Sequence, residues 1–74
     1  MIKMESFKRK FGEEIRGARL SKMLTQKELA AKCGLHYTFI GHIERGNKLP
    51  SIPTLLVIAA VLRVAPADMI AAAQ

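Results

Sequence analysis

The sequence predicts an all-α fold of five short helices, and three observations support that prediction. Its 74 residues suffice for one compact domain, residues 1–74. Apolar residues recur at helical spacing, and no stretch of four or more residues alternates strictly as a strand does. Glycine and proline interrupt the pattern at Gly34, between Gly46 and Pro53, and at Pro66, so every helix must be short.

The first predicted helix covers about residues 6–22, and its apolar stripe consists of Phe7, Phe11, Ile15 and Ala18. The second begins after Thr25. Thr25 and Glu28 are spaced as a capping box, in which the hydroxyl accepts a backbone N–H and the carboxylate reaches back. Gly34 then stands where a helix end favours the left-handed conformation. The inward-facing residues of this helix are Leu29, Ala30 and Cys33.

The third predicted helix covers residues 37–44 and has two distinct faces. At about 100° per residue, Ile40 and Ile43 form a narrow core stripe. The opposite arc carries hydrogen-bonding side chains and no aliphatic one: Tyr37, Thr38, Gly41, His42 and Arg45. Phe39 lies on the flank, where it packs on the first helix or touches a partner, and we favour packing. Gly41 marks either a close approach of another surface or an unconstrained exposed site.

The fourth predicted helix follows Ser51, a suitable N-cap, and tolerates Pro53 in its first turn. It is apolar nearly all round, and a fifth helix runs from Pro66 to Ala73. These helices offer more apolar surface than one side of a small core absorbs. We therefore expect residues 49–74 to form a symmetric dimer interface, the alternative being a wholly intramolecular core. The candidate interface residues are Leu56, Val64, Met69 and Ile70.

The formal net charge is +6, and it is unevenly distributed. Residues 1–48 hold eleven Lys or Arg against five acidic residues, whereas residues 49–74 hold only Arg63 and Asp68. A basic field attracts nucleic acid or an anionic membrane; the alternative is a solubilising surface. The apolar stretch 52–62 is too short to span a bilayer, which needs about 20 residues. No apolar signal segment opens the chain, and a single free cysteine fits the cytoplasm.

Catalytic and metal sites find no support in the sequence. There are no convergent carboxylates, no nucleophile–base pair and no phosphate-cradling glycine loop, so we expect neither an enzyme nor a cofactor or small-molecule ligand. His36 and His42 are six residues apart, which places them about 240° apart on a helix, so they cannot share a metal ion. Cys33 is expected to be a small core residue.

Residues 26–45 resemble the helix-turn-helix of the phage repressor and Cro-like (XRE-type) family of bacterial regulators. Counting Gln26 as the first position, the family expects a small residue at the fifth, glycine at the ninth and branched apolar residues at the fifteenth and eighteenth. This sequence has Ala30, Gly34, Ile40 and Ile43 there. The resemblance extends over roughly residues 11–70 through IRGAR, TQKELA, IERGNKLPS and TLLVIAAVLRV. The phrase HYTFIGHIERG also resembles restriction–modification controller proteins.

Three positions depart from the family pattern. The family usually has glycine where Met23 stands, so we expect a strained or rearranged turn there. Controllers often place Arg at the position of Tyr37, so their DNA preference does not carry over. His36 replaces the usual Ser or Asp cap; we expect it to cap less well and to contact DNA instead.

The resemblance implies a role for each matched position. Base edges would be contacted by His36, Tyr37, Thr38 and His42, and backbone phosphates by Gln26, Phe39, Arg45, Asn47 and Lys48. Arg19 and Glu44 would form a partly buried ion pair that locks the third helix against the first. Lys8, Arg9 and Lys10 are expected to provide a diffuse field rather than ordered contacts.

The function implied is a sequence-specific regulator of transcription that binds double-stranded DNA as a homodimer on a palindromic operator. Autoregulation suits such a short chain, as in controllers and Cro-like proteins. The alternative is an antitoxin-type protein-interaction module in which DNA binding is secondary. Bacterial or phage origin and a cytoplasmic, nucleoid-associated location follow from the same resemblance.

Overall fold

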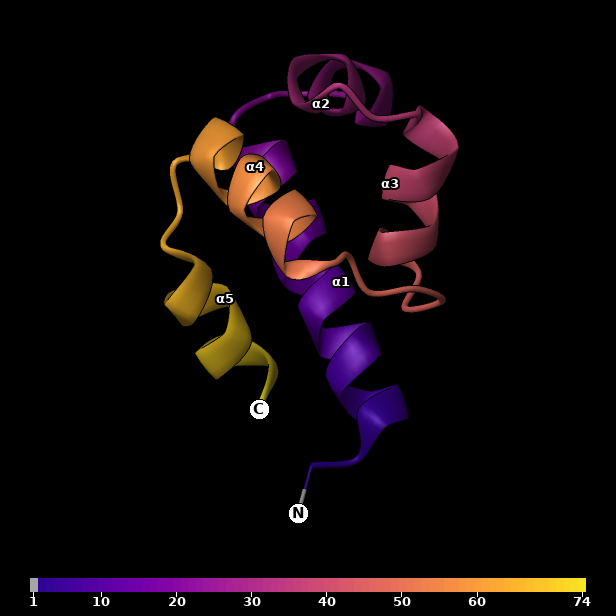
Figure 1. Ribbon diagram of the computed structural model, residues 1–74, viewed down its shortest axis with the longest axis vertical. Helices are drawn as coiled ribbons and strands as arrows, with labels where there is room; N and C mark the ends of the chain where they lie inside the picture. The colour runs from indigo at the N-terminus through magenta and orange to yellow at the C-terminus, as the bar shows by residue number, and fades with distance from the viewer. Residues whose placement is uncertain (1) are drawn as a thin grey trace.

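The computed structural model describes residues 2–74 and confirms the all-α prediction (Figure 1). The helices are α1 (Met4–Ser21), α2 (Gln26–Cys33), α3 (Tyr37–Glu44), α4 (Ile52–Leu62) and α5 (Pro66–Ala73). The predicted positions of α2 to α5 agree with these bounds. Helix α1 begins two residues earlier than the predicted start at residue 6. No strand occurs within residues 2–74.

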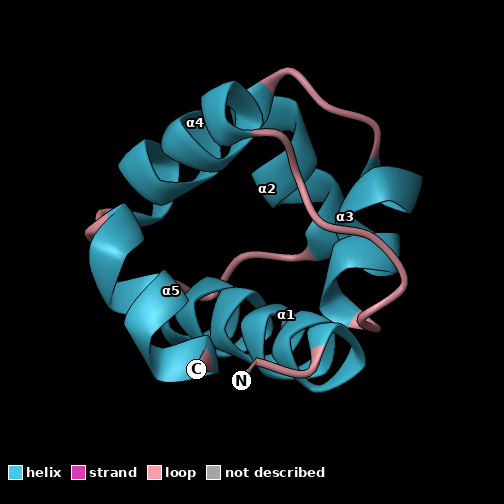
Figure 2. Ribbon diagram, turned by 60° about the horizontal axis from the view of Figure 1, so that its bottom comes forward, coloured by secondary structure: helices cyan, strands magenta, loops and turns pink. Residues whose placement is uncertain are grey.

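Helix α1 is the longest element and packs against two other helices. It contacts α5 along one side and α3 along another, while α2 contacts α3 and α4, and α4 contacts α5. These contacts close a ring in the order α1, α3, α2, α4 and α5, and Figures 1 and 2 show both termini at the same end of it. The molecule measures 35 × 22 × 22 Å, and α3 lies on its outer side.

Every helix contributes to one core. The largest fully buried side chains are Phe11, Ile15, Leu29, Ile40, Ile43, Ile58, Leu62 and Met69. Burial of an aliphatic or aromatic side chain of this size contributes roughly 1.5–3 kcal/mol. Because these short helices are marginal alone, this shared core is what stabilises them.

The prediction that Met69 lies in a dimer interface is wrong. Its side chain is only 2% exposed and lies in the core. Helix α5 is apolar on several sides, so spacing did not reveal which residue faces α1 and α4. Of the other candidates, Leu56 is 52% exposed, and Val64 and Ile70 are half-buried against the core.

Side chains cap the beginnings of α2, α3 and α4. The Thr25 hydroxyl accepts from the Glu28 backbone N–H at 3.0 Å, and the Glu28 carboxylate accepts from the Thr25 N–H at 2.9 Å. The expected capping box is therefore present. The Ser51 hydroxyl accepts from the Thr54 N–H at 3.3 Å, which confirms Ser51 as the N-cap of α4.

Helices α1 to α4 end in the same backbone hydrogen-bonding pattern, in which one residue adopts the left-handed conformation. Gly34 and Gly46 occupy that position at φ values of 69° and 79°, as their placement in the sequence suggested. Arg63 occupies it after α4 at φ 57°, which the sequence did not indicate. A non-glycine residue in this conformation costs about 1–2 kcal/mol.

Met23 ends α1 in the same conformation, with φ 58°. Its N–H donates to the Leu20 carbonyl at 2.9 Å, and the Leu24 N–H donates to the Arg19 carbonyl at 3.1 Å. These two bonds define a Schellman motif with methionine in the usual glycine position. The Met23 side chain is 90% exposed, so no packing offsets the strain that we expected at this turn.

Gly12 allows the closest approach between helices. A Cβ atom on Gly12 would collide with the backbone carbonyl oxygen of Ile43 and would lie 2.7 Å from that of Glu44. Because both obstacles are backbone atoms, a side chain at this position must push α3 away from α1. Gly12 therefore sets how tightly the end of α3 rests on α1.

Within residues 2–74, no single helix is long and apolar enough to cross a membrane. Helices α4 and α5 would reach that length together, but a bend of 106° separates them.

Candidate nucleic-acid interface

Helices α2 and α3 form a bent pair joined at Gly34. The Leu35 N–H donates to the Ala30 carbonyl at 2.8 Å, which fixes the left-handed turn. The inner residues of α3, Ile40 and Ile43, are fully buried. The bend thus lets α2 support α3 from one side, while the opposite side of α3 faces outward (Figure 1).

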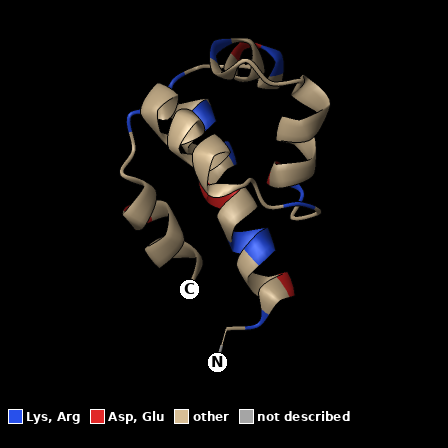
Figure 3. Cartoon of the chain, viewed as in Figure 1, with Lys and Arg blue, Asp and Glu red and all other residues tan. Residues whose placement is uncertain are grey.

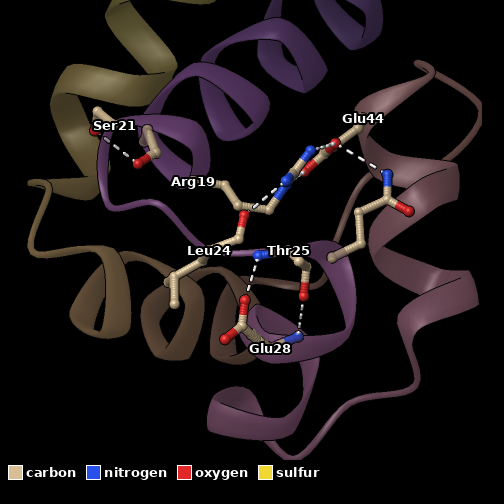
Figure 4. Close-up of polar contacts among 8 residues, drawn as sticks. Arg19, Ser21, Leu24, Thr25, Glu28 and Glu44 are labelled. Atoms are coloured by element: carbon tan, nitrogen blue, oxygen red, sulfur yellow. Dashed lines mark hydrogen bonds and ion pairs between the residues drawn. The ribbon is translucent and has the colours of Figure 1, made fainter.

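A buried ion pair fixes the end of α3 to the end of α1. Arg19 Nε donates to Glu44 Oε2 at 2.6 Å, and Arg19 Nη2 donates to Glu44 Oε1 at 2.9 Å (Figure 4). The remaining Arg19 nitrogen donates to the Leu24 carbonyl at 2.8 Å. The hydrogen bond to Glu44 holds the pKa of Arg19 above its usual value, against the opposing effect of burial. Bidentate geometry of this kind resists rotation of either partner.

Gln26 joins this ion pair at the start of α2. Its Nε2 donates to Glu44 Oε1 at 3.1 Å, so the side chain expected to bind a phosphate is held by a carboxylate instead. The carboxylate of Glu44 therefore links α1, α2 and α3.

Gly41 fits neither of the two interpretations that we considered. It is buried rather than exposed, and its neighbours belong to this chain. A Cβ on Gly41 would lie 3.0 Å from Arg45 Nη1 and 3.5 Å from Gln26 Oε1. The glycine therefore gives the Arg45 guanidinium room to lie across α3.

His36 is the N-cap of α3, and its side chain makes a cap hydrogen bond. Its Nδ1 accepts from the Thr38 backbone N–H at 3.1 Å. Because Nδ1 is the acceptor, the neutral ring carries its proton on Nε2. The ring stacks on Tyr37 with centroids 4.7 Å apart, and Lys27 Nζ lies 5.0 Å from the centre of the Tyr37 ring. The sequence did not indicate Lys27, because α2 brings it to Tyr37 only in the folded chain.

The ring of His42, like that of His36, uses Nδ1 as a hydrogen-bond acceptor. Its Nδ1 lies 3.4 Å from Arg45 Nη2, and arginine can only donate, so Nδ1 is the acceptor here as well. The neutral ring again carries its proton on Nε2. Both imidazoles of the motif thus have an Nε2–H donor available for a ligand that offers acceptors.

The structure brings most of the expected residues to one side of the molecule. The exposed ones are His36, Tyr37, Thr38, Arg45, Asn47 and Lys48, and His42 is half-buried. Phe39 is half-buried and packs against the core, which agrees with the packing that we favoured and does not favour the phosphate contact also expected of it.

Charge follows the same distribution as in the sequence. Figure 3 shows basic positions along α1, on α2 and in the loop after α3, while α4 and α5 carry none. The outward side of α3 therefore lies between basic segments.

The described residues were compared with the requirements of a metal site and of a reactive thiol. In the described part of the chain, no three His, Cys, Asp or Glu side chains lie together as a metal site requires. Burial raises the pKa of the Cys33 thiol, which disfavours the reactive thiolate.

Comparison with known proteins agrees with this geometry. A family model described as helix-turn-helix matches residues 15–69. The control protein C.BamHI of Bacillus amyloliquefaciens is 41% identical over 61 residues, covering 81% of this chain and 75% of that protein.

Solved structures give the same result. The restriction–modification controller C.AhdI of Aeromonas hydrophila has a TM-score of 0.79 and 34% identity, covering 82% of this chain and 92% of that one. SinR, a master regulator of biofilm formation solved in complex with DNA, has a TM-score of 0.76 and 33% identity, covering 80% and 95%. The chain belongs to the helix-turn-helix family of DNA-binding transcriptional regulators.

Proposed function

We propose that this protein is a restriction–modification controller that binds a palindromic operator as a homodimer and regulates its own expression. Two similar proteins, C.BamHI and C.AhdI, are named as control proteins, the second of a restriction–modification system. The observation that carries the proposal is the outward polar face of α3, held in place by the Arg19–Glu44 ion pair. A cytoplasmic location follows from this function.

In this proposal α3 enters the major groove, where base edges present distinct donors and acceptors. The Nε2–H groups of His36 and His42 favour acceptors such as guanine N7 and O6, adenine N7 or thymine O4. Thr38 can bond a base or place its methyl group on thymine. Tyr37, which contacts both His36 and Lys27, offers its hydroxyl to a base or phosphate.

Phosphate contacts would flank α3 on both sides. Arg45, Asn47 and Lys48 follow α3 and are exposed. On the other side, the first turn of α2 offers unpaired backbone N–H groups to an anion. Gln26 can reach a phosphate only by releasing Glu44, so we assign the contact here to the backbone first and to Gln26 second.

The homodimer would form through the apolar end of the molecule. Ile52, Leu56 and Val57 are 63%, 52% and 44% exposed on α4, although α4 carries no charged residue. Val64 and Ile70 are half-buried nearby. Two-fold pairing through this surface would place two copies of α3 about one DNA turn, ~34 Å, apart.

Selection of bound sites from random duplex DNA at physiological salt tests the proposal. A two-fold-symmetric consensus with half-sites about one turn apart is the expected result. Uniform weak binding to all sequences would count against a sequence-specific regulator.

The same exposed α4 side chains also suit an antitoxin-type module that covers another protein. Sedimentation of the purified protein distinguishes the two. A dimer at micromolar concentration supports the homodimeric regulator. A monomer that binds one protein at equal stoichiometry, without salt-dependent DNA binding, supports the antitoxin.

A further inference from the structure

A basic cavity adjoins α3 outside the helix-turn-helix motif. It lies between the start of α1 and the loop after α3 and has a volume of about 790 Å³. Four basic residues and one acidic residue line it, together with two uncharged residues of α1 and two loop residues: Lys3, Lys8, Arg9, Arg45, Glu5, Met4, Ser6, Gly46 and Asn47. Arg45 and Asn47 thus belong both to the cavity and to the proposed DNA-binding face.

Backbone contact fixes the walls of this cavity. A Cβ atom on Gly46 would lie 3.0 Å from Arg9 Cα and 3.2 Å from the Arg9 nitrogen. Gly46 also has φ 79°, a conformation that favours glycine. The loop after α3 therefore rests directly on the α1 backbone, and its side chains lie beside those of Lys8 and Arg9.

The three consecutive basic residues of α1 point in different directions. Gly12 marks the direction of α3, because it touches the last carbonyls of that helix. At 100° per residue, Lys8 and Arg9 lie within about 60° of that direction, whereas Lys10 lies about 160° away. Lys10 instead lines a separate cavity with Ala73 and Gln74 at the end of α5.

The basic side chains of the cavity lack an anionic partner. Across residues 2–74, the one ion pair within 4 Å joins Arg19 and Glu44. Glu5 shares the cavity but makes no ion pair with Lys8, Arg9 or Arg45. A cluster of cations around a concave surface, without internal compensation, favours an external anion.

We propose that Lys8 and Arg9, together with Arg45 and Asn47, bind a backbone phosphate of the DNA whose major groove receives α3. This inference rests on the proposed function and extends the contact surface from the helix-turn-helix onto α1. It replaces our expectation of a diffuse field for Lys8 and Arg9, and keeps that expectation for Lys10.

A nucleic-acid phosphate is favoured over other anions by position. A helix of about 10 Å diameter nearly fills a major groove about 12 Å wide. The loop at the end of α3 must then lie against the phosphates at the groove edge. The cavity opens at that loop, so its cations continue the same contact.

The experiment compares Lys8→Gln, Arg9→Gln and Lys10→Gln, each of which removes one charge from adjacent positions of α1. Affinity for the selected operator is measured as a function of salt for each variant and the unchanged protein. Loss of a phosphate contact reduces the slope of log affinity against log salt by about 0.9. Because the homodimer carries each substitution twice, we expect a reduction of about 1.8 for the Lys8 and Arg9 variants, with about tenfold weaker binding, and a markedly smaller change for the Lys10 variant.

A second experiment identifies which operator phosphate Lys8 and Arg9 contact. Single phosphates of the operator are replaced by neutral methylphosphonate. One replacement near the α3–α4 loop should weaken binding by the unchanged protein and by Lys10→Gln. The same replacement should have little further effect on the Lys8→Gln, Arg9→Gln double variant.

Equal slopes for all three variants, with intact operator binding by the unchanged protein, would overturn this inference alone. Loss of dimerisation in the Lys8 and Arg9 variants, with unchanged salt slope per dimer, would also overturn it, because the cavity would then face a second copy. Absence of salt-dependent binding by the unchanged protein would instead overturn the proposed function itself.

Discussion

Glu44 is the residue on which the placement of α3 depends most. Its carboxylate accepts from Arg19 twice and from Gln26 once, and its side chain is almost fully buried. Glu44→Ala would leave the Arg19 guanidinium buried without a counter-charge, which typically costs about 3–5 kcal/mol. We expect a large drop in melting temperature and weaker DNA binding as a consequence.

Thermal unfolding with a double variant as control tests this expectation. Replacing both partners by apolar residues, Arg19→Met with Glu44→Leu, removes the buried charge altogether and should recover much of the stability. Unchanged melting of Glu44→Ala would show that the ion pair does not hold α3.

Met23 offers a stabilising substitution. Its left-handed conformation and 90% exposure mean that Met23→Gly relieves strain of about 1–2 kcal/mol. The greater freedom of glycine in the unfolded chain offsets about 0.5–1 kcal/mol. We expect a net gain of roughly 0.5–1 kcal/mol in the free energy of unfolding by denaturant, whereas Gly34→Ala, the reverse change at the end of α2, should destabilise.

Glu28 confers a pH dependence on stability. Its hydrogen bonds with the backbone and side chain of Thr25 lower the pKa of the Glu28 carboxyl. A lowered folded-state pKa stabilises the protein above the unfolded value, and that contribution is lost as the pH falls through the folded value. The melting temperature of Glu28→Gln should therefore lie below that of the unchanged protein near pH 7, with the gap closing below about pH 4. A gap that stays constant from neutral to acidic pH would refute this assignment.

At the level of elements, the fit between α1 and α3 determines where the DNA-binding face lies. Gly12 and Gly17 belong to the same helix but meet different surroundings. A Cβ on Gly12 would strike the backbone of α3, whereas a Cβ on Gly17 would meet nothing within 4 Å.

Gly12→Ala should therefore destabilise the protein and weaken operator binding by displacing α3. Gly17→Ala should stabilise it by about 1 kcal/mol through helix propensity. Chemical denaturation and operator binding of the two variants measure both effects. Equal stability of the two variants would mean that the close approach of α1 and α3 is not required.

Local features were predictable at this level, and non-local ones were not. The capping box of Thr25, the turns at Gly34 and Gly46 and the core stripe of Ile40 and Ile43 each depend on residues within one or two helical turns. The left-handed Arg63 was not predictable, because arginine has no intrinsic preference for that conformation.

The features of the candidate site also fall into local ones, which the sequence predicts, and non-local ones, which it does not. The outward residues of α3 follow from helical spacing, and the Arg19–Glu44 pair followed only from the family resemblance. The bond from Gln26 to Glu44, the stacking of Lys27 on Tyr37 and the contact between Gly46 and Arg9 join different helices. Only the folded chain brings these residues together, so no local pattern contained them.

At the level of the whole molecule, the proposed DNA-binding face and the proposed dimer surface lie on different elements. The basic positions cluster on α1, α2 and the loop after α3. Of the exposed apolar side chains, Ile52, Leu56 and Val57 lie on the uncharged helix α4, whereas Met4 and Leu20 lie on α1. A dimer formed through the apolar end would present both basic faces to a single DNA duplex, which is the arrangement a palindromic operator requires.

The central claim is that the outward face of α3 reads DNA bases in two symmetric half-sites. Site selection from random duplexes, performed in parallel with the unchanged protein and with His42→Ala, tests it most directly. We expect the variant to lose about 1–3 kcal/mol of discrimination at one base pair in each half-site, at symmetric positions, while the rest of the consensus is kept. An unchanged consensus, or an equal weakening at every position, would contradict it.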